Sequence, residues 1–174
     1  MRAVLLSALL ATMGCRIDLD DPPGASADAN TTGRSCKVST STTCMDAAAH
    51  SDFAFINSKI FPLSCSASAS CHKDATSSGK LDLSLTNAYA AIMGPGGTGG
   101  VMSQIDKSRV LVVPGQPKQS YFYFIIQGIK AADGDPPFTD PPSNVGFMPM
   151  SNAAICCQKI DAIERWITAG AMNN

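Results

Sequence analysis

The chain has 174 residues, of which 13 are lysine or arginine and 14 are aspartate or glutamate, giving a net charge of −1 at neutral pH. This near-neutral balance argues against a nucleic-acid-binding protein, which needs a basic face, and against strong electrostatic steering of a charged partner. Aromatic residues make up only 6% of the chain, and its length suits one ordinary domain with a tail.

Residues 1–14 have the pattern of an export signal. Met1 and Arg2 give a positive start, and a short apolar run then leads to the small residue Gly14. The run is shorter than the ~20 residues that a bilayer-spanning helix needs. Gly14-Cys15 resembles a bacterial lipoprotein cleavage site, with cleavage by an ordinary signal peptidase as the alternative. We therefore expect Cys15 to be lipidated and to anchor the chain in the cell envelope, at the outer membrane, facing the periplasm or the cell surface.

Residues 15–50 are predicted to form a lipidated, disordered tether. From Arg16 to about His50 the chain has few large apolar residues and many Asp, Ser, Thr, Gly and Pro residues. Such a composition does not bury enough apolar surface to offset the entropy lost on ordering.

The seven cysteines set the next expectation. If Cys15 carries the lipid, six remain, and thiols outside the cytoplasm are not expected to stay free. We expect Cys36 and Cys44 to close a small loop within the tether. The alternative is that each of them pairs with one of the adjacent Cys156 and Cys157.

The folded domain is predicted to span residues 51–174 and to begin with a helix. Ser51-Asp52 is a good N-terminal cap. Apolar side chains then recur at helical spacing, at Phe53, Ile56, Ile60 and Phe61. Pro62 is expected to stop the helix, so that its C-terminal end points at Cys65.

Three further helices are expected. One covers residues 88–93 and is capped by Thr86, and another covers residues 117–127 with a proline in its first turn. The last begins at Ser151 or Asn152 and carries one apolar stripe. That stripe consists of Ile160, Ile163, Trp166 and Ile167. Because no segment has a strand pattern of any length, the sequence predicts an all-α fold of three to four short helices joined by long loops.

Cys65, Cys71 and His72 form the most informative motif. In Cys-x-x-Cys-His, two thiols add to the vinyl groups of a haem c and the histidine becomes an axial iron ligand. Here five residues separate the thiols, and residues 66–70 are alternating Ser and Ala. The vinyl groups are fixed on a rigid ring, so the extra chain must bulge, which small polar residues allow. A single thioether at Cys71, with iron on His72, is a variant of this interpretation.

Two other interpretations stay open. Cys65 and Cys71 could be disulfide-bonded to each other or to Cys156 and Cys157, leaving His72 as a solvated turn residue. Cys65, Cys71, His72 and Cys156 could also form a zinc site, although an oxidising compartment disfavours one.

Five segments follow one another in a fixed order between about residues 52 and 171. They are a helix leading to Cys71-His72, then Gly79-Lys80-Leu81-Asp82-Leu83-Ser84, Val113-Pro114-Gly115-Gln116-Pro117 with Ser120, Met148-Pro149, and Trp166-Ile167-Thr168-Ala169-Gly170-Ala171. This ordered set resembles a class I c-type cytochrome domain, of a divergent kind found in exported bacterial proteins. The resemblance implies a helical fold around one covalent haem c held by Cys65 and Cys71, with His72 as the proximal ligand. The chain departs from the family in its thiol interval and at Lys73, where glycine is usual.

The resemblance also implies a distal iron ligand, Met148, in a loop ahead of the last helix. Thioether sulfur suits haem iron and raises its potential relative to two imidazoles, and Pro149 restricts the loop. Met150 is the alternative ligand, and either methionine could instead fill a gap in the core. His50 is a further candidate, from the tether.

These observations predict a monohaem c-type cytochrome-like protein of the cell envelope that transfers single electrons to redox partner proteins and is not an enzyme. The chain has no Gly-x-Ser-x-Gly, His-Glu-x-x-His or phosphate-loop motif. The alternative is a haem-free, disulfide-stapled domain of the same fold that acts as a binding or structural module. A third possibility is a sensor or peroxidase-like haem protein with an open distal side.

Overall fold

The computed structural model describes residues 36–68, 70–74, 80–128, 131–133, 137, 147–150 and 155–174. Residues 1–14, which are predicted to be an export signal, and residues 15–35, which include Cys15 and the first part of the predicted tether, lie outside the described residues. Within them the regular structure is helical, with only an isolated antiparallel bridge between Met102 and Val110. The predicted all-α fold is therefore confirmed for this part of the chain. None of its helices is long and apolar enough to cross a membrane.

The helices are short except for the last. In chain order they are α1 (Thr42–Ala47), α2 (Phe53–Phe55), the π-helical turn η1 (Ile56–Ile60), α3 (Phe61–Ser64), α4 (Ala88–Met93), the 3-10 turn η3 (Pro117–Gln119), α5 (Tyr121–Gln127), the 3-10 turn η4 (Ala131–Asp133) and α6 (Cys157–Thr168). The helices that the sequence predicts are thus divided into more and shorter pieces.

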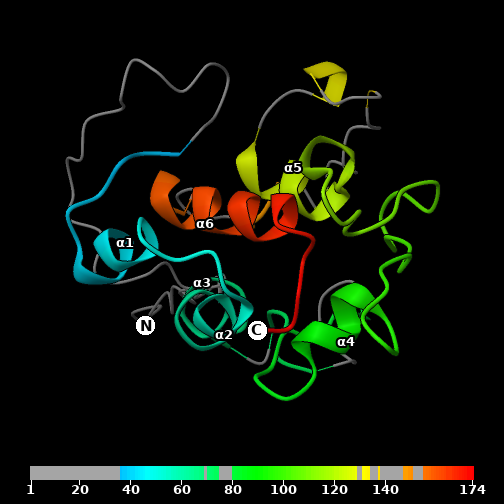
Figure 1. The fold of residues 1–174 in the computed structure, drawn as a ribbon, viewed down its shortest axis with the longest axis horizontal. Coiled ribbons are helices and arrows are strands. Elements are labelled where there is room, and N and C mark those ends of the chain that lie inside the picture. Colours follow the sequence, from blue (N-terminus) through cyan, green and yellow to red (C-terminus); the bar gives the residue numbers. More distant parts are fainter. Residues whose placement is uncertain are drawn as a thin grey trace, which may run out of the picture.

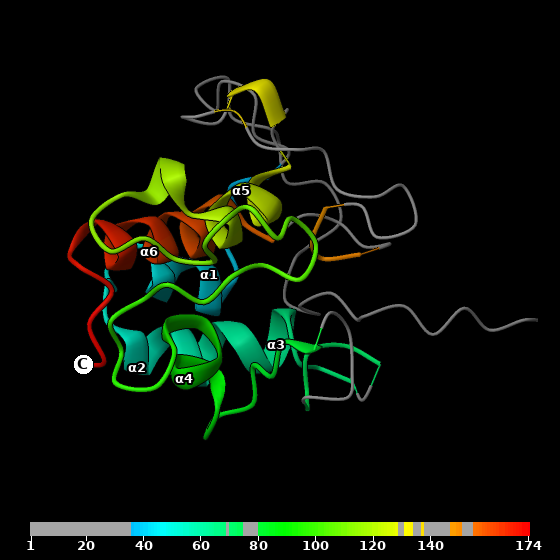
Figure 2. The ribbon, with the colours of Figure 1, turned by 90° about the vertical axis from the view of Figure 1, so that its right-hand side faces the viewer.

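Helix α6 lies at the centre of the fold, where it contacts α1, α5, η1 and η3. Figures 1 and 2 show α5 and α6 on one side of the molecule and α2, α3 and α4 on the other. Aromatic rings join the two sides. The ring of Phe53 lies 5.2 Å from that of Trp166, and the ring of Phe61 lies 5.9 Å from that of Phe122. Such pairs add to the stabilisation from burial alone.

The apolar stripe predicted for the last helix is confirmed. Its four members, Ile160, Ile163, Trp166 and Ile167, are each at most 1% exposed. The indole Nε1 of Trp166 donates to the carbonyl of Met172 at 2.8 Å, so the buried ring keeps a polar partner. The predicted start at Ser151 or Asn152 is wrong. Cys156 is the N-cap, with an extended backbone, and the helix begins at Cys157.

The first predicted helix continues past Pro62, which was expected to stop it. Asp52 caps it as predicted, because its carboxylate accepts a hydrogen bond from the Phe55 N–H at 2.7 Å. A proline inside a helix lacks the N–H that would bond four residues back. In η1 the bonds reach five residues back, as from the Phe61 N–H to the Ile56 carbonyl. This wider turn precedes Pro62, and the helix runs on to its end beside Cys65.

The two middle helices differ from their predictions in detail. Helix α4 covers the predicted range, but its N-cap is Asn87 and not Thr86. The helix predicted over residues 117–127 is interrupted at Ser120, whose backbone is extended. The Ser120 hydroxyl accepts from the Val113 N–H at 2.9 Å. It can thus hold the break against the preceding turn, a competition with helix that serine side chains commonly provide.

Residues 36–50, which the sequence assigns to the tether, pack against α6 where the structure describes them. Helix α1 contacts α6 directly. The N–H of Cys157 donates to the Lys37 carbonyl at 2.9 Å. The guanidinium of Arg165 donates to the Ala47 carbonyl at 2.7 Å, which satisfies a carbonyl at the end of α1.

Two disulfides join this segment to the start of α6. They link Cys36 to Cys157 and Cys44 to Cys156, with Cα–Cα distances of 5.1 and 6.4 Å. The predicted Cys36–Cys44 loop is therefore wrong, and the alternative pairing is the one observed. The reason is that α1 lies beside the N-terminal end of α6, so that each sulfur bonds across to the other element and not along its own segment.

Removing both disulfides should cost more stability than the sum of the two single removals. Cys36 and Cys44 are eight positions apart, and Cys156 and Cys157 are adjacent. Once one bond has formed, the other therefore closes a ring of only about eleven residues. The chain-entropy relation then gives roughly 3 kcal/mol for losing either bond and roughly 8 kcal/mol for losing both. Denaturant unfolding of the two paired Cys→Ser variants and of the quadruple variant measures these costs, and strict additivity would contradict the parallel arrangement.

Lys159 should make stability rise with pH in the alkaline range. Its side chain is 1% exposed, and burial lowers the pKa of its ammonium group from 10.5 to about 8. Between these values the unfolded chain binds more protons than the folded chain, so the free energy of unfolding increases with pH. The rise should be roughly 3 kcal/mol, at ~1.4 kcal/mol per pKa unit.

The test compares unfolding of Lys159→Met with that of Lys118→Met, at an exposed position, between pH 7 and 10.5. Lys159→Met should be the more stable variant at pH 7 and should lose the rise. If both variants keep the wild-type dependence of stability on pH, burial of the Lys159 ammonium group does not destabilise the folded protein, and the prediction is wrong.

Candidate functional site

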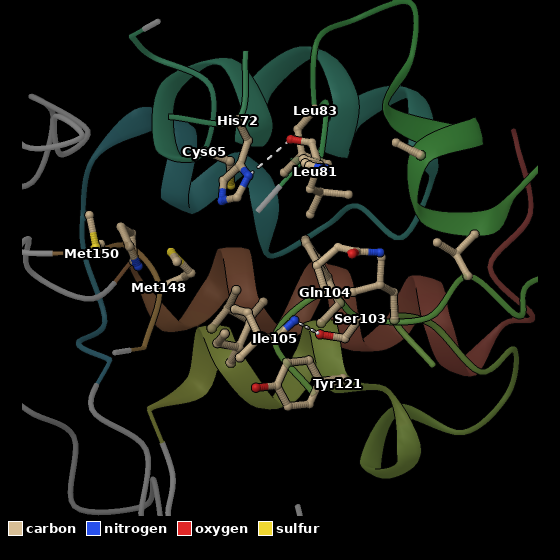
Figure 3. A pocket seen from close by; sticks show the side chains of 18 of the residues that line it. Cys65, His72, Leu81, Leu83, Ser103, Gln104, Ile105, Tyr121, Met148 and Met150 are labelled. Carbon is tan, nitrogen blue, oxygen red and sulfur yellow. Dashed lines mark hydrogen bonds between the residues drawn. The ribbon is translucent and has the colours of Figure 1, made fainter. Parts of the chain in front are cut away.

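A cleft of about 120 Å³ lies between the two sides of the fold. One wall is the end of α3 with the chain that follows it, and the other is α5 with the segment 101–105. Figure 3 shows the side chains of Cys65 and His72 on the first wall, with Ile105 and Tyr121 across from them. Most lining side chains are apolar. The cleft is thus a largely apolar slot with an imidazole and a thiol on one side.

His72 is held in this wall by three hydrogen bonds. Its N–H donates to the Cys65 carbonyl at 3.0 Å, and its own carbonyl accepts from the Leu83 N–H at 2.8 Å. Its Nδ1 lies 3.1 Å from the Leu81 carbonyl. A carbonyl only accepts, so this bond requires a proton on Nδ1. Nε2 is then the ring atom through which His72 could bind a metal, and a second-shell bond of this type orients ligating histidines.

Cys65 is the free cysteine of the described residues. Its N–H donates to the Phe61 carbonyl at 2.8 Å, which fixes it at the end of α3. Burial raises the pKa of its thiol to about 12, so the sulfur is protonated at neutral pH. Because Cys65 is free, and Cys156 and Cys157 are bonded to Cys44 and Cys36, the alternative in which Cys65 forms a disulfide with Cys71, Cys156 or Cys157 is wrong.

Cys71 has a different environment from Cys65. It is fully buried and disulfide-bonded, and it is not among the residues that line the cleft. Its N–H donates to the Ser68 carbonyl at 3.0 Å, and its sulfur lies 3.1 Å from the Ser68 hydroxyl. The structure therefore brings Cys65 and His72 together in the cleft and leaves Cys71 in the loop behind them.

Met148 and Met150 line the same cleft. The Met148 N–H donates to the Ile125 carbonyl at 2.9 Å, which ties the loop to the end of α5. The Met148–Pro149 peptide bond is cis. Met148 also packs against the hydrophobic core, so the core-filling role and a ligand role are compatible for it. Both methionines line the same cleft as His72.

His50, the further candidate ligand, is placed elsewhere. Its ring stacks on Phe55 with a centroid distance of 4.0 Å. Its Nδ1 lies 2.8 Å from a carboxylate oxygen of Asp52, and this hydrogen bond lowers the pKa of that carboxyl. His50 is not among the cleft residues and serves the cap of α2 instead.

Sequence reasoning missed two polar features of the cleft. Ser64 is only 3% exposed, and its hydroxyl has no hydrogen-bond partner among the described residues. Lys80 is exposed, lines the cleft and has a positive φ of 55°. Lys80 belongs to the segment 79–84 that carries the resemblance, but that segment gave it no role, and Ser64 has no motif signal. Position next to Cys65 was the only available indication for Ser64.

Within the described ranges, no group of three or more His, Cys, Asp or Glu side chains is arranged to hold a metal ion. The predicted zinc alternative also needed Cys156, whose sulfur is bonded to Cys44. Comparison of the chain with protein-family models, with curated proteins and with solved structures found no match. The function must therefore be argued from this cleft.

Replacing Ser64 with alanine should stabilise the ligand-free protein by about 1 kcal/mol, because a buried unpaired hydroxyl costs roughly 1–3 kcal/mol. The matched control is Ser58→Ala, which removes a hydroxyl that donates to the Ala54 carbonyl at 2.7 Å on the same helical segment. Ser58→Ala should leave stability unchanged or slightly lower. Loss of stability in Ser64→Ala, measured by denaturant unfolding, would mean that this hydroxyl has a partner such as a bound water.

Proposed function

We propose that this protein is an exported, monohaem c-type electron carrier whose iron is held between His72 and Met148. The observation that carries the proposal is the shared cleft. An imidazole and a thioether that are far apart in the sequence line the same slot, together with a free thiol. Such a carrier passes single electrons to redox partner proteins in the cell envelope.

The donor set suits haem iron. When bound, a haem supplies reversible one-electron chemistry, and imidazole with thioether ligation favours a higher potential than two imidazoles. The chain contributes a histidine whose Nδ1 is committed to the Leu81 carbonyl, which directs ligation to Nε2 and fixes the ring. Met150 is the alternative second ligand, because it lines the same cleft.

The rest of the cleft provides a suitable shell. Leu81, Leu83 and Ile105 line the cleft near His72 with apolar side chains. A dry, weakly polar shell disfavours added charge on a bound cofactor and so tunes its potential. Lys80 and Gln104 also line the cleft and are exposed. They are the side chains that could receive the two carboxylates of a porphyrin at its solvent edge.

The space is the limiting feature. A cleft of about 120 Å³ is below the ~300–1,000 Å³ of common small-molecule pockets and near the ~150 Å³ of a cavity that takes one benzene ring. The walls must therefore separate when a macrocycle enters. The side chains that would bind the iron suit a haem, but the cleft is large enough for a haem only after its walls have separated.

That volume and the bonded Cys71 favour the second candidate function. In it the domain is a haem-free, disulfide-stapled module that binds a small apolar molecule in the same cleft. The two functions differ in one requirement, because only the haem protein needs His72 and a methionine as ligands.

The test is an absorbance spectrum of the full chain, exported in a host that can attach haem. We expect a Soret band in the wild type, loss of most of it in His72→Ala, and a changed spectrum with a lower midpoint potential in Met148→Ala. The matched controls are His50→Ala and Met172→Ala, whose side chains do not line the cleft.

Each other outcome selects a different function. A wild type with no Soret band would leave the haem-free module. A haem spectrum that neither Met148→Ala nor Met150→Ala alters would favour the sensor or peroxidase-like protein with an open distal side.

A further inference from the structure

The end of α3 presents two adjacent side chains to the cleft, Ser64 and Cys65. Cys65 is a free thiol. The Ser64 hydroxyl is buried and has no hydrogen-bond partner among the described residues. An unpaired buried hydroxyl is costly, so this end of the cleft has the features of a site that a bound molecule completes.

The loop from Cys65 to His72 closes on itself. The His72 N–H donates to the Cys65 carbonyl at 3.0 Å, so the two residues are neighbours in space although they are seven positions apart. Cys71 precedes His72 directly but is buried outside the cleft lining and is disulfide-bonded. Cys71 is thus the cysteine next to His72 in the sequence, whereas Cys65 is the cysteine that lines the cleft.

We infer that the haem is attached by a single thioether, formed by Cys65, and that Cys71 holds the loop that positions His72. The inference rests on the proposed function and assigns its covalent bond to one residue. Cys71 is then a positioning residue, because its sulfur is already bonded and its backbone N–H closes a turn on Ser68.

The attachment step is an addition. The Cys65 sulfur forms a C–S bond to one carbon of a vinyl group, the thiol hydrogen passes to the other vinyl carbon, and the C=C π bond is consumed. No oxidant or reductant is required. The second vinyl group stays intact, because among the described residues Cys65 is the one free thiol that lines the cleft.

The test uses the full-length protein exported in a host that can attach haem. The denatured wild-type chain should carry one haem mass, and fragment-ion spectra of its peptides should place that mass on Cys65. The pyridine haemochrome, whose α band moves with the number of unreacted vinyl groups, should show one free vinyl. Cys65→Ser should lose the covalent mass but still bind haem that acidified organic solvent extracts.

If the Cys71→Ser variant folds, it should retain the haem mass on Cys65. If it does not fold, the peptide that carries haem in the wild type still tests the inference, because that measurement needs no variant. A haem mass on Cys71, on both cysteines or on neither would overturn the inference. If acidified organic solvent extracts the haem from the wild type, the thioether inference is wrong, whereas the proposed electron-carrier function is kept. A wild type without any haem band would end both proposals together.

Discussion

The cleft depends first on the hydrogen bonds that hold His72. Its N–H, its carbonyl and its Nδ1 bond to Cys65, Leu83 and Leu81 respectively, so that two stretches of chain on either side of a long loop are joined at one residue. The ring therefore has its tautomer and direction before any ligand arrives. Preorganisation of this kind is what allows a ligating side chain to bind without a further ordering cost.

The opposite side of the cleft is held through α6. Met148 is tied to the end of α5 by its bond to Ile125, and α5 packs on α6. Contact between α6 and η1, together with the Phe53–Trp166 ring pair, sets the separation of the two walls. The two disulfides join residues 36–50 to the start of α6, and none of their four cysteines lines the cleft. They can therefore hold the scaffold while the cleft itself widens.

Sequence reasoning found the elements whose signal is local and lost those that depend on contacts across the chain. The α6 stripe and the Asp52 cap follow from spacing and capping chemistry, and both are confirmed. Helix α1 was missed because its burial comes from Cys44, Ala47 and the face of α6, which no local pattern reveals. The interruption at Ser120 depends on a side-chain bond to Val113. For the site, the motif indicated Cys65, Cys71 and His72, but only the fold shows that Cys65 lines the cleft and Cys71 does not.

The five-residue interval between Cys65 and Cys71 adds little to the entropy cost of closing the loop. Closing a loop costs only about 0.6 kcal/mol more for each doubling of its length, so three extra residues add on the order of 1 kcal/mol. The loop contains the Cys71–Ser68 backbone bond and is closed by the His72–Cys65 bond, and each such bond contributes ~0.5–1.5 kcal/mol. These bonds offset the added entropy. The interval therefore does not prevent Cys65 from standing next to His72. The longer interval instead places Cys71, the cysteine next to His72, outside the cleft, where it can form a structural bond.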